Sequence, residues 1–208
     1  MHQTLTMAGL DPATQPPRVG AVNESLALAD ARATAWPARG PAMVKDGEAA
    51  QRAAFIAEAK TWLGTPFRDQ GDIKGPNGAV DCAMLLVRCA TKAGMIPADF
   101  DPRPYPPQWL LHRDEERFLG IVRNFAREVQ REPIPGDVIV YKVARCFAHG
   151  GIVIEMPGSS PGTGLHLIHA YYKTQSVIVS PLHEAELAFL ESGKPRPFKL
   201  FDCWSERP

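Results

Sequence analysis

The residues with the most reactive chemistry include four cysteines, and one of them is distinguished by its position. Cys82 follows Asp81, and the run 82–93 before Gly94 is predicted to form a helix. A cysteine in the first turn of a helix is unusual, because unpaired amides and the positive end of the helix dipole stabilise thiolate over thiol. The same amides could donate to the oxyanion that forms when sulfur attacks an acyl carbon. Cys82 is therefore a candidate nucleophile.

A nucleophilic cysteine needs a base, and His149 lies where a base could reach it. This histidine opens the run 149–154, His-Gly-Gly-Ile-Val-Ile, at the mouth of a predicted strand. The two glycines, Gly150 and Gly151, let a substrate or another backbone approach closely. An imidazole in this place could deprotonate the thiol and later protonate a leaving amine.

A third group should hold the base in the correct tautomer, and His169 on the next predicted strand is the candidate. Leu165 and Leu167 mark one face of that strand, and His169 shares their face because side chains alternate along a strand. His166 is three residues away and therefore points to the opposite face. We expect His169, and not His166, to face His149.

The cysteines also have plainer interpretations. Cys82 could be a small buried residue, as Cys89 is expected to be. Cys146 lies three residues before His149, but in a predicted connection between strands and without a helix N-terminus. The wide spacing of the cysteines, with Cys203 far from the rest, is not that of a disulfide framework or of a zinc site. We expect free thiols, no metal and no cofactor.

The elements that must position these residues change character along the chain. Apolar spacing predicts a helix over 47–63, a glycine- and proline-rich loop over 65–80 and a further helix over 114–128. Short β-rich runs follow, separated by turn residues, at 138–141, 151–155, 165–170, 176–179 and 198–201. Helices first and strands afterwards predict an α+β fold, with N-terminal helices packed on an antiparallel β-sheet.

Composition limits the function classes. The chain has 208 residues, 45% of them hydrophobic, and 23 basic side chains balance 23 acidic ones. One core is expected, and no global field favours nucleic acid. No stretch approaches the length of a membrane span, and the first residues lack the pattern of a secretory signal, so we expect synthesis as a soluble cytoplasmic protein. Residues 1–46 are predicted to be a disordered extension, or the product of a start codon assigned too early.

Five short motifs occur together in one order, and their combination resembles a known family. They are Trp62-Leu63-Gly64-Thr65-Pro66-Phe67, Val80-Asp81-Cys82, Ile134-Pro135-Gly136-Asp137-Val138, His149-Gly150-Gly151-Ile152 and His169-Ala170. The pattern resembles the NlpC/P60 family of papain-like cell-wall cysteine peptidases, most closely its short members from phage and gene-transfer-agent tails. The resemblance implies a papain-like cysteine peptidase domain over 47–208. It also implies that Cys82 is the nucleophile, His149 the base and His169 the residue that orients the base.

The resemblance also implies a substrate and partners. The substrate is the peptidoglycan stem peptide, cut by an endopeptidase at the bond between γ-linked D-Glu and a diamino acid. The partners are hub or baseplate proteins of a phage-like tail, which would carry the chain in a virion-like particle and open the cell wall for DNA. Phe67, Asp81 and Gly150 are the candidate substrate-binding residues, although capping is the main role expected of Asp81.

This sequence departs from the family pattern at two places. Phe67 stands where the family usually has a tyrosine whose hydroxyl reaches the active site, and Ala83-Met84 replaces the usual Ser-Gly. Two alternatives therefore stay open beside the peptidase. One is an amidase or acyltransferase that uses the same cysteine and histidine, and the other is a weakly active or inactive tail-hub or wall-binding subunit.

Overall fold

The elements are taken from a computed structural model that describes residues 44–105, 116–158, 164–182, 185–190 and 192–204. These residues all belong to one unit of the chain, Gly40–Pro208. The predicted extension 1–46 lies outside the described residues except for its last three, which are helical. Part of the predicted helix 114–128 also lies outside them, because the description resumes at residue 116.

Two helices precede most of the strands, as the sequence predicts. Helix α2 runs Val44–Lys60 and buries Phe55 and Ala59, which are four residues apart and therefore share one helix face. Helix α3 runs Cys82–Lys92 and ends before Gly94, whose φ of 69° suits glycine at a helix terminus. The shorter helices are α5, Arg117–Arg123, and α6, Ala185–Ala188.

The loop between α2 and α3 contains a small antiparallel hairpin of β1, Asp72–Ile73, and β2, Ala79–Val80. The main sheet has six strands in the order β3-β8-β4-β5-β6-β7, and all its pairs are antiparallel. Its strands are β3 Arg127–Val129, β4 Val138–Val143, β5 Cys146–Glu155, β6 Leu165–Tyr171, β7 Ser176–Pro181 and β8 Phe198–Asp202.

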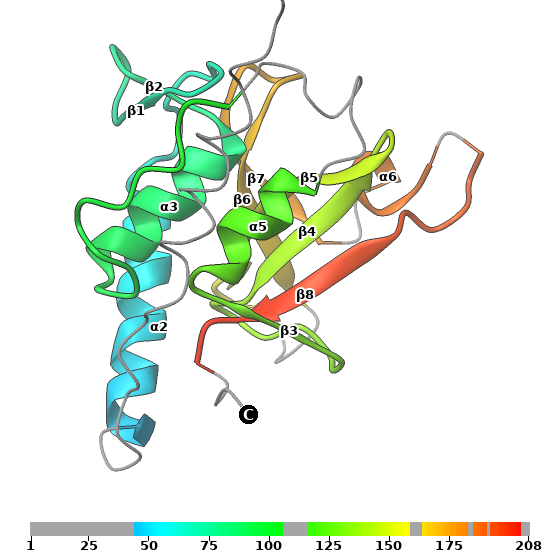
Figure 1. Ribbon diagram of the computed structural model, residues 1–208. Helices are drawn as coiled ribbons and strands as arrows, with labels where there is room; N and C mark the ends of the chain where they lie inside the picture. Colours follow the sequence, from blue (N-terminus) through cyan, green and yellow to red (C-terminus); the bar gives the residue numbers. More distant parts are fainter. Residues whose placement is uncertain (1–43, 106–115, 159–163, 183–184, 191, 205–208) are drawn as a thin grey trace, which may run out of the picture. The chain divides into compact units, whose positions relative to one another are not determined.

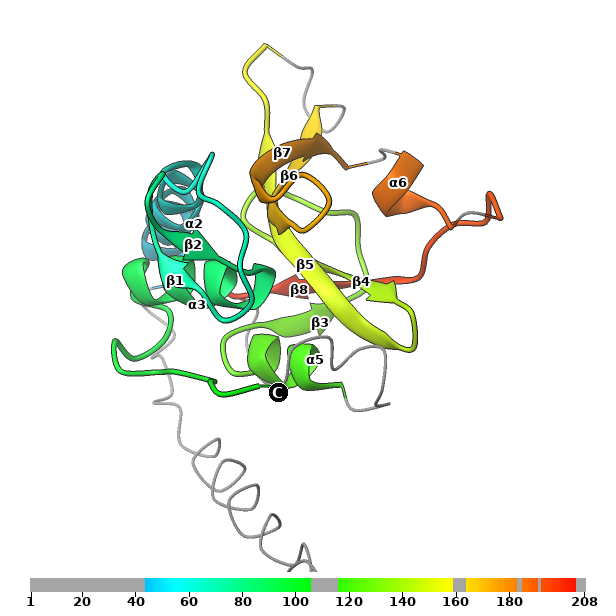
Figure 2. The ribbon, with the colours of Figure 1, turned by 90° about the horizontal axis from the view of Figure 1, so that it is seen from above.

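Helices α2 and α3 lie side by side and pack against the sheet through β5 (Figures 1 and 2). Seven of the eleven residues of α3 are buried, which makes it the central helix of the core. The α+β class, the antiparallel sheet and the position of Cys82 at a helix N-terminus are therefore confirmed.

Two predictions of local structure are wrong. The helix predicted to continue to Glu128 ends at Arg123, and 127–129 form the edge strand β3 instead, because they pair with β8. Cys146 is not in a connection but is the first residue of β5, which begins five residues earlier than predicted. In both cases strand pairing overrides the local pattern: β3 pairs with the distant β8, and the start of β5 pairs with the preceding strand β4.

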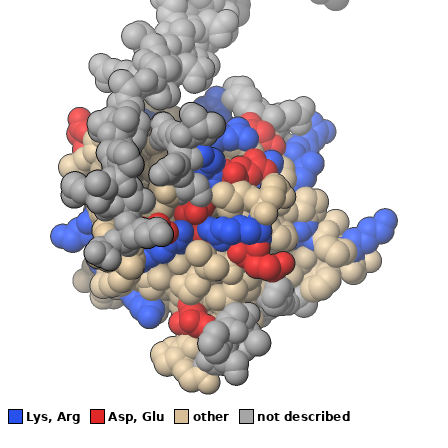
Figure 3. Space-filling view, turned by 90° about the horizontal axis from the view of Figure 1, so that it is seen from below, with Lys and Arg blue, Asp and Glu red and all other residues tan. Residues whose placement is uncertain are grey.

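The surface carries both signs of charge. On the face shown in Figure 3, Lys and Arg atoms are interleaved with Asp and Glu atoms. This agrees with the equal numbers of basic and acidic residues in the sequence. Within the described residues, no helix is long and apolar enough to cross a membrane.

Candidate active site

Cys82 is the first residue of α3, and Asp81 is the N-cap. Asp81 has extended backbone angles, and its Oδ1 accepts a hydrogen bond of 2.8 Å from the backbone N–H of Met84. This contact satisfies one of the amides that a helix leaves unpaired at its N-terminus. The predicted capping role of Asp81 is confirmed, and the cap fixes the backbone that carries the sulfur.

The other carboxylate oxygen of Asp81 is also occupied. Oδ2 accepts from the backbone N–H of Gln70 at 2.7 Å and from the hydroxyl of Tyr105 at 2.6 Å. The side chain is only 4% exposed, and burial raises its pKa. All these donors come from the chain itself, so the geometry assigns Asp81 to holding the helix end. Its predicted contact with substrate stays a prediction.

The sulfur of Cys82 faces β5 at the position of His149. Its hydrogen-bond partner is the carbonyl oxygen of Ala148 at 3.8 Å, and the backbone N–H of Gly150 is also directed at it. Residues 148 and 150 flank His149 on the strand, so the sulfur lies against the backbone on either side of this histidine. Among the described residues, the sulfur makes no hydrogen bond to the ring itself. Resting enzymes commonly show looser contacts of this kind than their complexes do.

Strand pairing explains how a helix end reaches this part of β5. Strand β6 pairs with β5 only from Ile152 to Glu155 within the described strands. The preceding residues of β5 pair with β4 on one edge, where His149 lies opposite Tyr141. The other edge is open to Cys82 at Gly150. The thiol of Cys82 therefore lies at the edge of β5 that β6 pairs with further along the strand, from Ile152 to Glu155.

A glycine sets the approach of β5 and β6 just beyond His149. A Cβ atom on Gly151 would lie 2.6 Å from the carbonyl oxygen of Ile168 and 2.9 Å from the Cβ of His169. Side chains larger than hydrogen do not fit at these distances. The sequence interpretation that the glycines permit close backbone approach is confirmed at this residue.

The two histidines on the strands form a hydrogen-bonded pair. His149 Nε2 and His169 Nδ1 are 2.8 Å apart, and His169 Nε2 is 3.0 Å from the hydroxyl of Ser180 on β7. This series fixes the orientation of both rings and leaves Nδ1 of His149 as the nitrogen available to a thiol. The expectation that His169 faces His149 is confirmed, whereas His166 bonds to the carbonyl oxygen of Gly164.

Both imidazoles are neutral at physiological pH. Burial lowers the pKa of His149 to about 3, with a further contribution from His169, and burial lowers the pKa of His169 to about 4. The ring of Tyr171 lies 5.6 Å from that of His149 and 5.1 Å from that of His169, which adds to the apolar surroundings of the pair. A neutral imidazole can accept a proton, as a general base must.

The state of the thiol differs from the expectation drawn from the helix end. Burial raises the pKa of Cys82 well above its usual value, and the charge of Asp81 raises it further. The backbone amides of Gly150, Cys82 and Ala83 lower the pKa, but by less. The amides at the helix end do lower the pKa of Cys82, but their contribution is smaller than that of burial. Both the thiol and the imidazole are therefore neutral at rest, and a thiolate at Cys82 would form only by proton transfer to a base.

The two departures from the family pattern lie next to this helix end. Phe67 forms a backbone bridge with Val80, and its N–H donates to the carbonyl oxygen of Gln175. Phe67 is therefore close in space to the residue before Asp81, although its ring has no hydroxyl to offer. Met84 is fully buried in the core, so its bulk is accommodated there.

Sequence reasoning missed Ser180 and Tyr105. Ser180 directly follows the predicted strand run 176–179. Its hydrogen bond to His169 can be recognised only once β7 is paired with β6. Tyr105 is 24 residues from Asp81, and no local pattern links the two. A hydroxyl-bearing residue at the end of a β-rich run was a usable signal for Ser180, but Tyr105 offered none.

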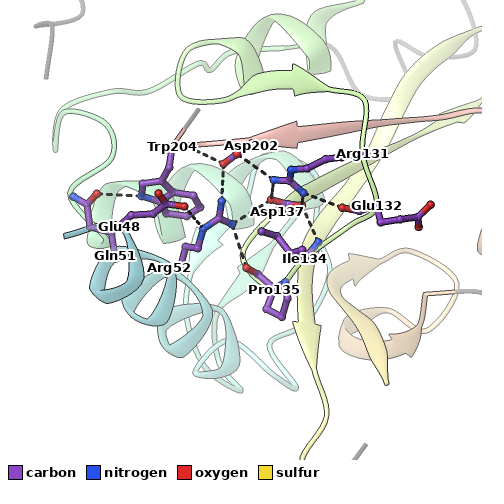
Figure 4. A network of polar contacts seen from close by, with 10 residues as sticks. All are labelled: Glu48, Gln51, Arg52, Arg131, Glu132, Ile134, Pro135, Asp137, Asp202 and Trp204. Carbon is purple, nitrogen blue, oxygen red and sulfur yellow. Dashed lines mark hydrogen bonds and ion pairs between the residues drawn. The ribbon is translucent and has the colours of Figure 1, made fainter. Parts of the chain in front are cut away.

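A second buried polar cluster does not include Cys82, His149 or His169. It joins α2 to β8 (Figure 4). Asp137 is 0% exposed and receives hydrogen bonds from Arg52 at 3.2 Å and from Arg131 at 2.6 and 3.0 Å. Asp202 receives one bond from each arginine, at 2.8 and 3.1 Å. We call these four residues the arginine network. Asp137 belongs to the Ile-Pro-Gly-Asp-Val motif, so this motif serves packing.

Within the described part of the chain, no group of three or more His, Cys, Asp or Glu side chains is arranged to hold a metal ion. The cysteines are free thiols, with Cys82 and Cys203 partly exposed and Cys89 and Cys146 buried.

No protein-family model and no curated protein sequence matches the chain. Several solved structures are similar to it. A P60 domain of an antigen from M. avium subspecies paratuberculosis has 15% identity and a TM-score of 0.44, covering 78% of this chain and 100% of that one. An N-acetylmuramoyl-L-alanine amidase from Bacteroides uniformis has 12% identity and a TM-score of 0.45, covering 74% and 99%. The peptidoglycan hydrolase RipB from Mycobacterium tuberculosis has 18% identity and a TM-score of 0.44, covering 90% and 94%.

Proposed function

We propose that the chain is a cysteine peptidase that hydrolyses stem peptides of bacterial peptidoglycan. The observation that carries the proposal is the hydrogen bond of 2.8 Å between His149 and His169, with His149 on the segment of β5 whose backbone contacts the sulfur of Cys82. The substrate class comes from the five ordered motifs that resemble NlpC/P60 peptidases. The chemistry comes from the arrangement of the residues.

The proposed reaction begins with two neutral groups. His149 takes the proton of Cys82 as the sulfur forms a bond to the carbonyl carbon of the scissile amide. Backbone N–H groups of Cys82 and Gly150, which are directed at the sulfur, lie near the oxygen that becomes negative. His169 holds the ring in place and stabilises the imidazolium that forms.

The second half of the reaction restores the enzyme. The imidazolium of His149 gives its proton to the leaving amine, and the C–N bond breaks to leave a thioester on Cys82. A water molecule then attacks the thioester while His149 again accepts a proton. The carboxylic acid is released as the thiol recovers its proton. No redox step or bound metal is needed for this sequence.

The proposal is tested by incubating purified peptidoglycan with the protein and following the release of soluble fragments by mass spectrometry. We expect Cys82→Ala and His149→Ala each to lower the rate by more than about a thousandfold. Cys203→Ala is the matched control, because Cys203 is also a partly exposed free thiol but is not at a helix N-terminus. Its rate should equal that of the unmodified protein.

The fragments also identify the bond. New termini between γ-linked D-Glu and a diamino acid support the endopeptidase, whereas a cut between muramic acid and L-Ala makes the chain an amidase that uses the same cysteine and histidine. No release of fragments by the unmodified protein would overturn the hydrolase, and equal release by both site variants would overturn the assignment of the site. The tail-hub or wall-binding alternative would then account for the absent hydroxyl at Phe67 and the raised pKa of the thiol.

We further propose that the chain works as part of a phage-like tail, where local cleavage of the wall allows DNA to pass. The resemblance of the motifs to short tail-encoded peptidases supports this placement. Particles that carry Cys82→Ala should assemble normally and lose wall penetration. Failure of assembly in this variant would favour the structural alternative.

A further inference from the structure

Tyr105 lies outside the motifs of the proposed active site, yet its side chain ends beside the nucleophile's helix. The residue is 8% exposed and belongs to the segment between α3 and α5. Its hydroxyl donates to Asp81 Oδ2 at 2.6 Å, a short and charge-assisted hydrogen bond. Burial and the charge of Asp81 raise the pKa of Tyr105, so the hydroxyl keeps its proton and remains a donor.

The segment that carries Tyr105 is fastened independently of that hydroxyl. Arg103 donates to the carbonyl oxygen of Gln70 at 2.9 Å, to Asp72 at 2.8 Å and to Asp101 at 2.6 Å. These contacts hold 101–105 against the loop that precedes α3. The bond from Tyr105 to Asp81 is therefore not required to anchor the segment, and its effect on the charge of Asp81 can be considered separately.

Asp81 affects the sulfur through its charge. The carboxylate is buried next to Cys82 in the chain and disfavours the thiolate. A hydroxyl dipole whose hydrogen points at the carboxylate offsets part of that field. Among the described residues, the other charges that act on this cluster are those of Asp69, which acts on Asp81, and of Arg103, which acts on Tyr105. The neutral His149 lies on β5, between the two residues whose backbone contacts the sulfur.

We propose that Tyr105 is a positioning residue for Cys82: its hydroxyl bonds to Asp81, holds the carboxylate as the helix cap and offsets the negative charge beside the sulfur. The proposal deepens the proposed function, because it takes Cys82 as the nucleophile. According to this proposal, the segment after α3 influences the reactivity of the thiol. That segment belongs to none of the five motifs.

The test measures the rate at which iodoacetamide alkylates Cys82 between about pH 7 and pH 9, by mass spectrometry of the Cys82 peptide. Tyr105→Phe should slow the reaction about threefold or more at each pH, the equivalent of a rise of about half a unit in thiol pKa. Tyr141→Phe is the matched control, because it removes the hydroxyl of another buried tyrosine, which bonds to the carbonyl oxygen of Leu182. It should not slow alkylation.

A purely structural role for Tyr105 gives the opposite sign. A loosened segment exposes Cys82 and speeds its alkylation, and global opening also exposes the buried Cys89. Alkylation of Cys82 at the unmodified rate or faster in Tyr105→Phe overturns the proposal. The rate for Cys89, followed in the same digest, identifies any opening of the fold.

A double-mutant cycle tests whether the effect passes through Asp81. Asp81→Asn keeps an oxygen that can cap the helix but removes the charge, so it should speed alkylation of Cys82. In that background Tyr105→Phe should have no further effect on the rate. A slowdown of unchanged size in the Asp81→Asn background, or an Asp81→Asn protein that is no faster than the unmodified one, overturns the proposal. None of these rates requires a substrate, so the result is independent of whether the chain proves to be a hydrolase.

Discussion

The described part of the molecule contains two buried polar clusters that differ in how they accommodate charge. In the arginine network, each carboxylate of Asp137 and Asp202 meets both guanidinium groups, so the buried charges compensate one another. In the histidine pair of His149 and His169, burial removes the charge instead and keeps both rings neutral. One cluster holds permanent charges in fixed pairs, and the other holds groups that are able to accept a proton.

This difference separates stability from chemistry. Removing one partner of a buried ion pair leaves the other charge with less compensation, which destabilises the fold. A neutral imidazole can gain a proton during a reaction, and burial of the ring makes this protonation cost free energy. We therefore expect substitutions in the arginine network to act mainly on folding, and substitutions in the histidine pair to act mainly on activity.

The largest effect is expected for Asp137→Asn. The substitution removes a fully buried negative charge and leaves Arg52 and Arg131 with fewer acceptors. The free energy of unfolding, measured by urea denaturation, should fall by about 3 to 5 kcal/mol. Residual activity per folded molecule should stay close to that of the unmodified protein.

Glu48→Gln is the control for this substitution. Glu48 also pairs with Arg52, at 2.9 Å, but its side chain is 33% exposed. An exposed pair contributes about 1 kcal/mol or less. Equal losses for Glu48→Gln and Asp137→Asn would contradict the view that burial gives the network its importance.

The next largest effect is expected for His169→Leu. This change removes the hydrogen bond that orients His149 and keeps an apolar side chain of similar bulk, so kcat/KM on peptidoglycan fragments should fall by about a hundredfold or more. The unfolding free energy should fall by about 1 to 3 kcal/mol, because two buried groups, Nε2 of His149 and the hydroxyl of Ser180, lose a hydrogen-bond partner.

His169→Asn should restore part of the activity, since an amide can bond to Nε2 of His149. His166→Leu is the control, because His166 bonds to a backbone oxygen outside the pair. If His169→Leu lowered stability as much as Asp137→Asn and left kcat/KM unchanged, the assignment of chemistry to one cluster and stability to the other would be reversed.

The smallest effect is the dependence of stability on pH. An unfolded histidine has a pKa of about 6.5, whereas His149 and His169 have values of about 3 and about 4 in the fold. Because these pKa values are lowered, the stabilisation is complete above about pH 6.5 and is lost as the pH falls toward 4. One such histidine accounts for about 2 kcal/mol over two pH units.

Urea denaturation at a series of pH values measures this loss. His169→Leu should reduce the slope of unfolding free energy against pH over that range, because one of the two neutral imidazoles is gone. An unchanged slope would show that the pair is not held neutral by burial.

The parts of the site that depend on local sequence could be predicted. Asp81 as a cap, Cys82 in the first turn and Gly94 at the helix end follow from preferences of single residues. The pairing of His169 rather than His166 with His149 follows from the alternation of side chains along a strand.

The parts of the fold and of the site that depend on contacts distant in the sequence could not be predicted. The strand at 127–129 exists because β8 pairs with it, although the helix predicted over 114–128 extends into these residues. The charge balance of Asp137 depends on Arg52, which is 85 residues away. Burial of the thiol is likewise set by the packing of the whole core, so the sign of its pKa shift was not readable from the helix end alone.

The packing around Gly151 leaves no room for a side chain at this position. An added methyl group there would meet the backbone of Ile168 at 2.6 Å and push β6 away from β5. His149 and His169 sit on those two strands, so the same displacement would lengthen the bond between their rings. The alignment of a proton acceptor is thus governed by a residue that has no functional group, and even alanine at this position should behave as an inactivating substitution.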